Sequence, residues 1–189
     1  AGKVYMAREG LFDDLDVAIS WHPGALNSVR LGKGTALNSA KFQFFGKTAH
    51  AAGDPHNGRS ALDAVELMNV GANYLREHVI KEASIHYVIT SGGGQPNVVP
   101  DFAEVWYFVR APRRDQVDHI YERLIDVARG AALMTGTTFA IDFLTGCYEV
   151  LINQALADVM WDCLQKVGPP EFDEHDLEFA RKLTETFDK

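Results

Sequence analysis

The first residue that could do chemistry is His22, which follows the apolar run from Val17 to Trp21. We expect this run to form a buried strand, and ligands and metals collect at the carboxyl ends of strands in open α/β sheets. Neutral imidazole is the commonest metal ligand among side chains, yet a catalytic zinc needs three protein ligands. From the residues alone, His22 is either one ligand of a larger metal site or a hydrogen-bonded structural histidine.

His50 and Asn97 stand in two loops that are rich in small residues. His50 lies in GKTAHAAGDPHNGRS, where its ring is accessible and can donate a hydrogen bond to negative charge developing on a carbonyl oxygen. Asn97 follows GGGQP, whose glycines allow the loop to bend close to a ligand. The alternatives are a surface histidine and an asparagine that serves only a turn. For His56, in the first loop, we expect a structural or solvent-facing role.

Arg110 is expected at the end of a strand, shortly before a proline. Its planar guanidinium suits a substrate carboxylate, and the alternative is a solvated arginine at a sheet edge. Ser60 is better explained as a helix cap than as a nucleophile, because no GxSxG motif surrounds it. The two cysteines, Cys147 and Cys163, form no CxxC motif and no Cys/His cluster, which indicates two reduced and mostly buried thiols in a cytoplasmic protein.

The elements that would position these residues follow one another regularly between residues 40 and 147. Alternating apolar residues predict strands, and apolar stripes at spacings of three and four predict helices. The strands are expected at 40–47, 83–90, 102–110 and 137–145, and the helices at about 61–79 and from about Val117 to near Gly136. The order β-α-β-β-α-β predicts an α+β, ferredoxin-like unit, with a four-stranded antiparallel sheet and both helices on one face.

Residues 1–39 and 148–189 do not fit inside such a unit. They contain an expected helix at 3–9 that ends at Gly10, the strand before His22, and two further helices after residue 150. We interpret these flanks as parts of a second, α/β domain into which the 40–147 unit is inserted. The first residue is alanine rather than methionine, which also favours a piece of a longer protein.

Composition and charge exclude several classes of protein. Hydrophobic residues make up 47% and charged residues 23% of the 189 residues, as in folded globular proteins. The formal net charge of −8 leaves no basic face, so we expect no nucleic-acid partner. No apolar run reaches the ~18–20 residues that span a bilayer, so we expect no membrane-spanning segment.

Three segments, taken in order, resemble one enzyme family. They are KVYMAREGLFDDLDVAISWHPG, GKTAHAAGDPHNGRSALDAVELMNVG and GGGQPNVVPDFAEVWYFVRAP, and the resemblance covers nearly the whole chain. The family is that of the metal-dependent amidohydrolases, aminoacylases and carboxypeptidases with a two-metal site. The resemblance implies an α/β catalytic domain with an inserted ferredoxin-like lid, or dimerisation domain, which agrees with the architecture expected from periodicity.

The resemblance also implies a role for each candidate residue. His22 matches a metal-binding position, and His50 matches the lid histidine that reaches the partner's active site and polarises the scissile amide. Asn97 matches a lid asparagine near the substrate carboxylate or carbonyl, and Arg110 looks like the lid arginine that pairs with a substrate carboxylate. The implied substrate is an N-acyl or aminobenzoyl amino acid such as aminobenzoyl-glutamate. The implied partners are a second copy, joined through the lid sheet, and a second kind of subunit.

Finally, the resemblance implies what this chain lacks. In the family, most metal ligands and the glutamate general base lie upstream of the matched segment, and a last metal-binding histidine lies downstream. The zinc or manganese then belongs to the complete enzyme, and we expect this chain alone to bind no metal and to be inactive. The alternative is a stand-alone dimerisation or small-molecule-binding module without catalysis. Flanks packed as a self-sufficient layer favour that alternative, whereas flanks with exposed apolar faces favour the fragment.

Overall fold

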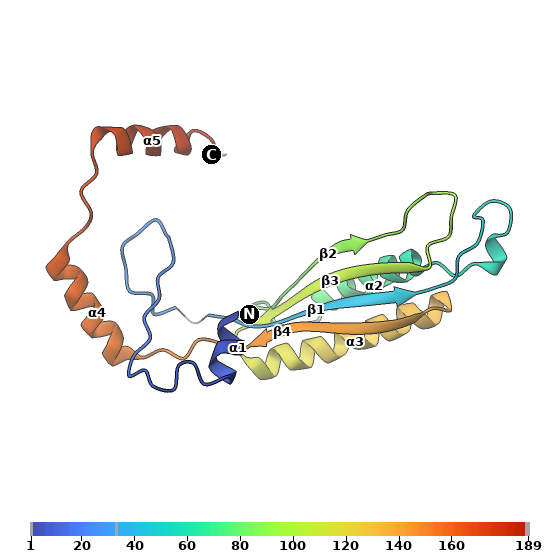
Figure 1. The fold of residues 1–189 in the computed structure, drawn as a ribbon, viewed down its shortest axis with the longest axis horizontal. Helices are drawn as coiled ribbons and strands as arrows, with labels where there is room; N and C mark the ends of the chain where they lie inside the picture. The colour runs from blue at the N-terminus through green and yellow to red at the C-terminus, as the bar shows by residue number, and fades with distance from the viewer. Residues whose placement is uncertain (1, 33, 188–189) are drawn as a thin grey trace. The chain divides into compact units, whose positions relative to one another are not determined.

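The computed structural model describes residues 2–32 and 34–187 (Figure 1). These residues divide into two compact units. The first, which we call the sheet unit, comprises the chain up to Val17 and from Gly34 to Leu151. The second, which we call the flanking unit, comprises Ala18–Gly32 and the described residues from Ile152 onward.

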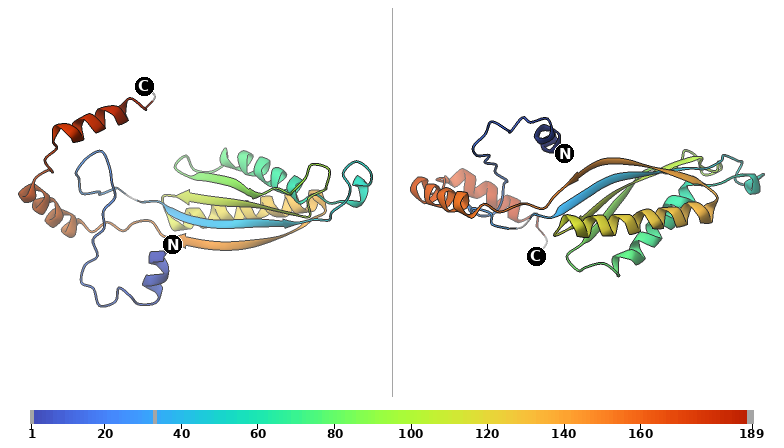
Figure 2. Two further views of the ribbon diagram at one scale, coloured as in Figure 1. Left: turned by 45° about the horizontal axis from the view of Figure 1, so that its top comes forward. Right: turned by 90° about the horizontal axis from the view of Figure 1, so that it is seen from below.

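The sheet unit contains a four-stranded antiparallel sheet with two helices on one of its faces (Figure 2). The elements are β1 (Ala36–Phe45), α2 (Ala61–Arg76), β2 (Ser84–Ser91), β3 (Phe102–Ala111), α3 (Arg114–Thr135) and β4 (Thr138–Cys147). The spatial order of the strands is β2-β3-β1-β4, which is the ferredoxin-like arrangement that the sequence predicts. The predicted fold class is therefore confirmed.

The hydrophobic core lies between the sheet and the two helices. Because side chains alternate along a strand, every second residue of the central strands β1 and β3 faces the helices. Phe42 and Phe44 of β1 are completely buried, and Phe42 packs edge-on against Tyr107 of β3 with ring centroids 5.7 Å apart. The predicted inner face of β3 is confirmed, since none of its four members is more than 1% exposed: Ala103, Val105, Tyr107 and Val109.

Single residues fix the start of α2, the end of α3 and the close packing of the two helices. The hydroxyl oxygen of Ser60 accepts a hydrogen bond of 3.1 Å from the Asp63 amide and caps α2, as predicted. Gly136 ends α3 in the left-handed conformation, with φ 65°. A Cβ atom on Gly71 would lie 2.6 Å from a methyl carbon of Val127, so glycine is what lets the two helices pack this closely.

The N-terminal helix α1 (Gly2–Arg8) also belongs to the sheet unit. The chain leaves the helix through Gly10, which has φ 73° and is the stop that the sequence predicts, and the Leu11 amide donates to the Met6 carbonyl at 3.0 Å. The hydroxyl of Tyr5 donates to the carbonyl oxygen of Leu144 in β4 at 3.3 Å. Helix α1 is therefore tied to an edge of the sheet.

The prediction of a strand just before His22 is wrong, because the described residues 17–24 adopt no regular secondary structure. Ile19 is 64% exposed and Trp21 is 85% exposed. A strand is stable where neighbouring strands take up its backbone hydrogen bonds and a core covers its side chains. The strands of the described residues all lie in the sheet unit, so this apolar run has no strand partner.

The flanking unit contains two helices, α4 (Gln154–Val167) and α5 (Glu174–Thr184), where the sequence predicts them. Ala157 is the buried residue of α4, and none is buried in the described part of α5. Large apolar side chains on both helices are exposed, among them Val167 at 84% and Phe179 at 64%. Among the described residues, each helix is too short or too polar to cross a membrane.

Candidate functional site

Two loops extend from the same end of the sheet, which we call the distal end (Figure 1). The loop at 46–60 follows β1 and includes the short helix η1 (Pro55–Asn57), and the loop at 92–101 joins β2 to β3. The Ala51 amide donates to the Asn97 carbonyl at 3.0 Å, and the Val99 amide donates to the Ala49 carbonyl at the same distance. These bonds bring the segments that carry His50 and Asn97 side by side.

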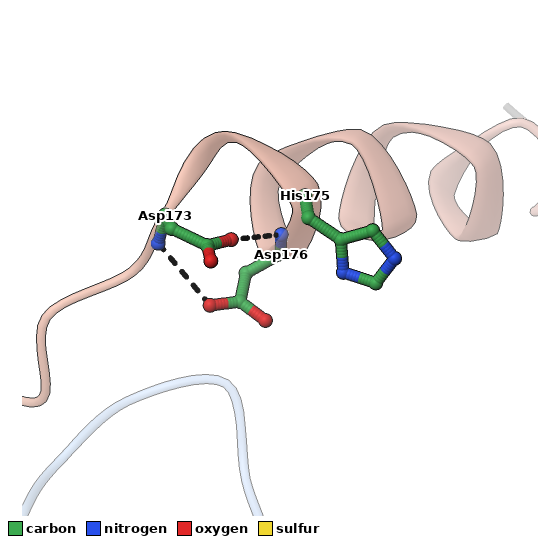
Figure 3. Close-up of side chains that lie close together, drawn as sticks. All are labelled: Asp173, His175 and Asp176. Carbon is green, nitrogen blue, oxygen red and sulfur yellow. Dashed lines mark hydrogen bonds between the residues drawn. The ribbon is translucent and has the colours of Figure 1, made fainter.

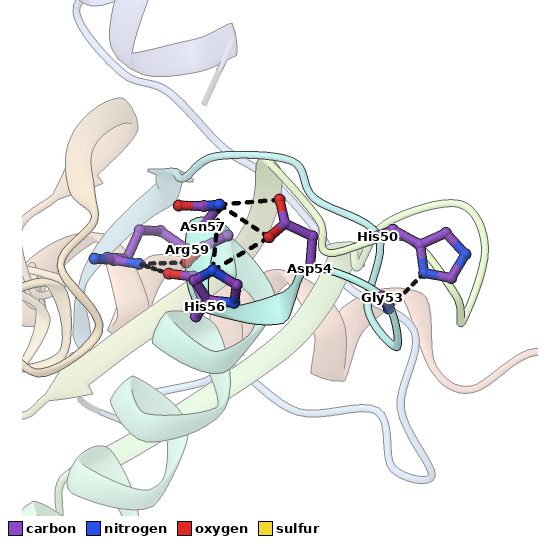
Figure 4. Close-up of polar contacts among 7 residues, drawn as sticks. His50, Gly53, Asp54, His56, Asn57 and Arg59 are labelled. Atoms are coloured by element: carbon purple, nitrogen blue, oxygen red, sulfur yellow. Dashed lines mark hydrogen bonds and ion pairs between the residues drawn. The ribbon is translucent and has the colours of Figure 1, made fainter.

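His50 is exposed, and its ring is held by the turn that follows it. The Asp54 amide closes this turn by donating to the His50 carbonyl at 2.9 Å. The ring nitrogen Nδ1 accepts hydrogen bonds from the amides of Gly53 at 2.9 Å and Ala52 at 3.2 Å. The other edge of the ring points away from the polar contacts of this loop (Figure 4).

The base of the His50 loop is fixed by backbone hydrogen bonds. Lys47 and Arg59 exchange two such bonds, of 2.8 and 2.9 Å, across the neck of the loop. The Gly46 amide donates to the carbonyl of Asp101 at 2.8 Å. A Cβ atom on Gly46 would lie only 2.0 Å from the Arg59 carbonyl oxygen, so glycine is required where the two sides of the neck approach each other.

A second set of contacts braces the middle of the same loop (Figure 4). The carboxylate of Asp54 accepts from the side-chain amide of Asn57 at 2.9 and 3.0 Å, and the His56 Nε2 lies 3.3 Å from it. Arg59 donates to the carbonyl of Gly58 at 2.6 Å and to that of His56 at 3.1 Å. His56, with a side chain that is 78% exposed, has the structural and solvent-facing place expected from the sequence.

Arg110 lies near the opposite, proximal end of the sheet, where β1 begins and β4 ends. It pairs with Leu37 of β1 and Ser84 of β2. Its Nε is buried without a hydrogen-bond partner, and its guanidinium carbon lies 5.5 Å from the centre of the Phe108 ring. At ~3.3 Å per strand residue, Arg110 is about 26 Å from Phe102 at the distal end of β3. The structure therefore separates Arg110 from His50 and Asn97.

A buried carboxylate that the sequence did not single out lies on the open face of the sheet. Glu104 is 8% exposed and accepts hydrogen bonds of 2.7 to 2.8 Å from Lys41, Gln43 and Thr90. Burial acts to raise the pKa of Glu104, but these bonds and the Lys41 charge outweigh it and lower the pKa to about 2. Each carboxylate oxygen has a partner, so Glu104 is a structural charge that joins β1, β2 and β3.

His22 has no other metal-binding group in its hydrogen-bond contacts. Its ring is exposed, and Nδ1 lies 2.8 Å from the carbonyl oxygen of the next residue, Pro23. Its position as a metal ligand stays a prediction. One imidazole does not make a metal site, because a catalytic zinc needs three protein ligands.

The described part of the chain brings three potential metal ligands together at the start of α5 (Figure 3). These are Asp173, His175 and Asp176, and all three are exposed. The two carboxylates already serve as helix caps, because the amide of Asp176 donates to Asp173 at 2.9 Å and the amide of Asp173 donates to Asp176 at 3.2 Å. This cluster is explained by capping, so the described residues assemble no convincing metal centre of their own.

Comparison with known proteins matches residues 36–133 to the family described as peptidase dimerisation domain. One of the subunits of the p-aminobenzoyl-glutamate hydrolase of Escherichia coli (strain K12) is 46% identical over 187 residues, which is 98% of this chain and 39% of that protein. The Xaa-Arg dipeptidase of Mus musculus is 32% identical over 88% of this chain and 39% of its own length. The chain therefore spans about two fifths of the length of these relatives.

The fold also matches a solved structure. The aminobenzoyl-glutamate utilization protein from Klebsiella pneumoniae superposes with a TM-score of 0.69 at 23% sequence identity. The match covers 96% of this chain and 50% of the other. At this identity, the likeness bears on the fold alone.

Proposed function

The chain belongs to the peptidase dimerisation domain family, and we propose that it forms the lid and dimerisation part of a metal-dependent amidohydrolase. The proposed reaction is hydrolysis of the amide of an N-acyl or aminobenzoyl amino acid, such as aminobenzoyl-glutamate. The names of the two relatives, a p-aminobenzoyl-glutamate hydrolase and a dipeptidase, support a reaction of this class.

The observation that carries the proposal is the separation of the candidate residues between the two ends of one sheet. His50 and Asn97 share the distal end, and Arg110 lies near the proximal end, where the chain enters β1 and leaves β4. The proximal end is joined by short segments to the residues outside the sheet unit. We infer that Arg110 serves the active site of its own subunit, while His50 and Asn97 reach the active site of a partner across a two-fold axis.

The chemistry of these residues fits amide hydrolysis. The His50 ring would donate a hydrogen bond to the oxyanion that develops on the scissile carbonyl. The guanidinium of Arg110, whose buried Nε has no partner, would pair with the carboxylate of the amino-acid part. Asn97 is exposed beside the His50 turn, where its side-chain amide would bind a carboxylate or carbonyl oxygen of the substrate.

We propose that the residues before β1 and residues 148–189 belong to the catalytic domain and that the lid, for which the sequence predicted residues 40–147, begins with β1 at Ala36. The exposed apolar side chains of the flanks support this reading over a stand-alone module, because a missing domain would cover them. Large exposed examples are Trp21, Leu26, Val167 and Phe179. The divalent metal, zinc or manganese, belongs to the complete enzyme, to which this chain contributes His22 as a ligand.

We further propose that the lid sheet joins two copies of the enzyme in a homodimer, with a small-molecule amide as substrate. A second kind of subunit is a further expected partner, since the Escherichia coli relative is named as one of the subunits of its hydrolase. The two cysteines, Cys147 and Cys163, are free, which supports a cytoplasmic enzyme. The expectation that both thiols are mostly buried is wrong, because Cys147 is half-buried and Cys163 is exposed.

A chimeric enzyme tests the proposal. Residues 1–189 replace the aligned segment of the Escherichia coli relative, and hydrolysis of p-aminobenzoyl-glutamate is measured with added zinc or manganese. We expect the chimera to hydrolyse this substrate and the 189-residue chain alone to be inactive. Turnover by the isolated chain, or a folded chimera that hydrolyses neither this substrate nor other N-acyl amino acids, would contradict the proposal.

A further inference from the structure

We propose that the turn after His50 fixes the tautomer of its ring, so that the proton lies on Nε2 and the ring acts only as a hydrogen-bond donor toward a ligand. The positioning residues are Ala52 and Gly53, which act through their backbone amides. The inference rests on the proposed function for the identity of the ligand, a substrate carbonyl. The tautomer itself rests only on the geometry of the turn.

Two hydrogen-bond donors meet at the Nδ1 atom of His50. The amides of Gly53 and Ala52 point at this nitrogen from 2.9 and 3.2 Å. A backbone amide can only donate, and its hydrogen is fixed by the covalent geometry of the chain. Nδ1 must therefore offer its lone pair. In a neutral imidazole one nitrogen is an acceptor and the other carries the proton, so the proton lies on Nε2.

The turn is built to keep this arrangement. The Asp54 amide donates to the His50 carbonyl at 2.9 Å and closes the turn around the ring. The Ala51 amide is engaged by the Asn97 carbonyl at 3.0 Å, so the first residue of the turn is anchored to the neighbouring loop. At Gly53, a Cβ atom would lie at an ordinary contact distance of 3.4 Å from Nδ1, so the approach of the ring depends on the Gly53 amide and not on the absence of a side chain.

The fixed tautomer limits the chemistry that the His50 ring can do. A ring with Nδ1 engaged presents Nε2–H to the outside, and Figure 4 shows this edge pointing away from the loop. Such a ring can stabilise negative charge on an oxygen by donating a hydrogen bond. It has no free lone pair with which to take a proton from water, so the turn makes His50 an electrophile rather than a general base.

The test is nitrogen NMR of the complete 189-residue chain, labelled with ¹⁵N, at a pH where exposed histidines are neutral. We expect the His50 Nδ1 to show the shift of an unprotonated nitrogen, Nε2 that of a protonated one, and a coupling between Nδ1 and the Gly53 amide nitrogen through the hydrogen bond. The exposed His119 serves as the internal reference for a ring that exchanges between tautomers. A proton on the His50 Nδ1, or tautomer averaging like that of His119, would overturn the inference.

Two variants at Gly53 sharpen the test. Gly53→Pro removes the amide hydrogen, and we expect the coupling to disappear and the tautomers of His50 to mix. Gly53→Ala keeps the amide and places its Cβ at an ordinary contact distance of 3.4 Å from Nδ1, so we expect the tautomer to be retained. An unchanged tautomer in a folded Gly53→Pro chain would show that Gly53 does not position the ring. If that variant does not fold, the coupling in the unmodified chain decides.

The outcome is independent of the proposed function. A fixed tautomer together with full activity of a His50→Ala chimera would leave this inference standing and remove the catalytic role of His50. Mixed tautomers of His50 together with an inactive His50→Ala chimera would overturn this inference and leave the catalytic role of His50 standing.

Discussion

The amide of Ala51 donates a hydrogen bond of 3.0 Å to the carbonyl oxygen of Asn97, a residue 46 positions further along the chain in the neighbouring loop. This bond joins the turn that carries His50 to the loop that carries Asn97. The two candidate groups at the distal end of the sheet are therefore held by one structure rather than by two independent loops.

The joined loops predict a common opening in native-state hydrogen exchange. The amides of Ala51 and Val99 both donate across the loops, so one opening event should expose both. We expect them to exchange with similar protection and more slowly than the unstructured chain. Exchange of Ala51 at the rate of an unstructured peptide, with Val99 protected, would show that the loops open separately.

Replacement of glycine by alanine should have opposite effects on stability at two positions, one in α3 and one in α2. Gly130 of α3 is exposed, and a Cβ there meets no atom within 4 Å, so Gly130→Ala should stabilise the fold by about 1 kcal/mol through helix propensity. Gly71→Ala gains the same propensity but places its Cβ 2.6 Å from a Val127 methyl carbon. We expect a net loss of about 1 kcal/mol or more. Thermal unfolding of both variants measures the difference, and a stabilised Gly71→Ala protein would contradict the helix packing.

The hydrogen-bonded carboxylate of Glu104 should contribute stability that is lost at acidic pH. Its folded-state pKa of about 2 lies below the ordinary value of 4.5, so the ionised form stabilises the fold above about pH 4.5. That contribution is lost as the pH falls from about 4.5 to 2, because the unfolded chain binds the proton first. We expect Glu104→Gln to lower the unfolding free energy at pH 7 by about 1–2 kcal/mol and to flatten its pH dependence in this window. Parallel pH profiles of both proteins would contradict the prediction.

The proposed role of His50 predicts that removing its side chain slows turnover more than it weakens substrate binding. In the chimeric enzyme, His50→Ala should lower kcat by about 10²-fold or more with a smaller change in KM, as expected for a donor that acts on developing charge. His119→Ala, which removes an exposed histidine of α3, is the matched control and should leave kcat unchanged. Equal kcat values for the two variants would remove His50 from the reaction.

Much of the sheet unit could be predicted from the sequence, because local patterns determine it. The alternation around Phe42 and Tyr107 predicted which faces of β1 and β3 are buried. The residues Ser60 and Gly136 predicted one helix start and one helix end, since a cap and a left-handed glycine act within one turn.

The features that the sequence did not predict depend on partners far away in the chain. The run that includes Ile19 has the composition of a buried strand, but composition does not supply neighbouring strands. The network of Glu104 depends on the register of β3 against β1, which places Gln43 opposite it. The contact between the His50 and Asn97 loops likewise depends on the pairing of β3 with β1 and β2, which brings the two loops to the same end of the sheet.

The separation of His50 from Arg110 follows from strand direction. Strands β1 and β3 are antiparallel, so the loop after β1 and the end of β3 must lie at opposite ends of the sheet. This relationship was implicit in the predicted β-α-β-β-α-β order. In the proposed dimer, this separation lets one sheet contribute residues to two active sites.

Mixing two inactive chimeras tests that central claim most directly. One carries His50→Ala and the other Arg110→Ala, and the two are combined under conditions that exchange subunits. If Arg110 serves its own subunit and His50 serves the partner, one site in each mixed dimer has both residues, and random mixing restores about a quarter of the parental activity. If mixed dimers form and show no more activity than the separate variants, His50 and Arg110 do not belong to different subunits of one active site, and the account is wrong.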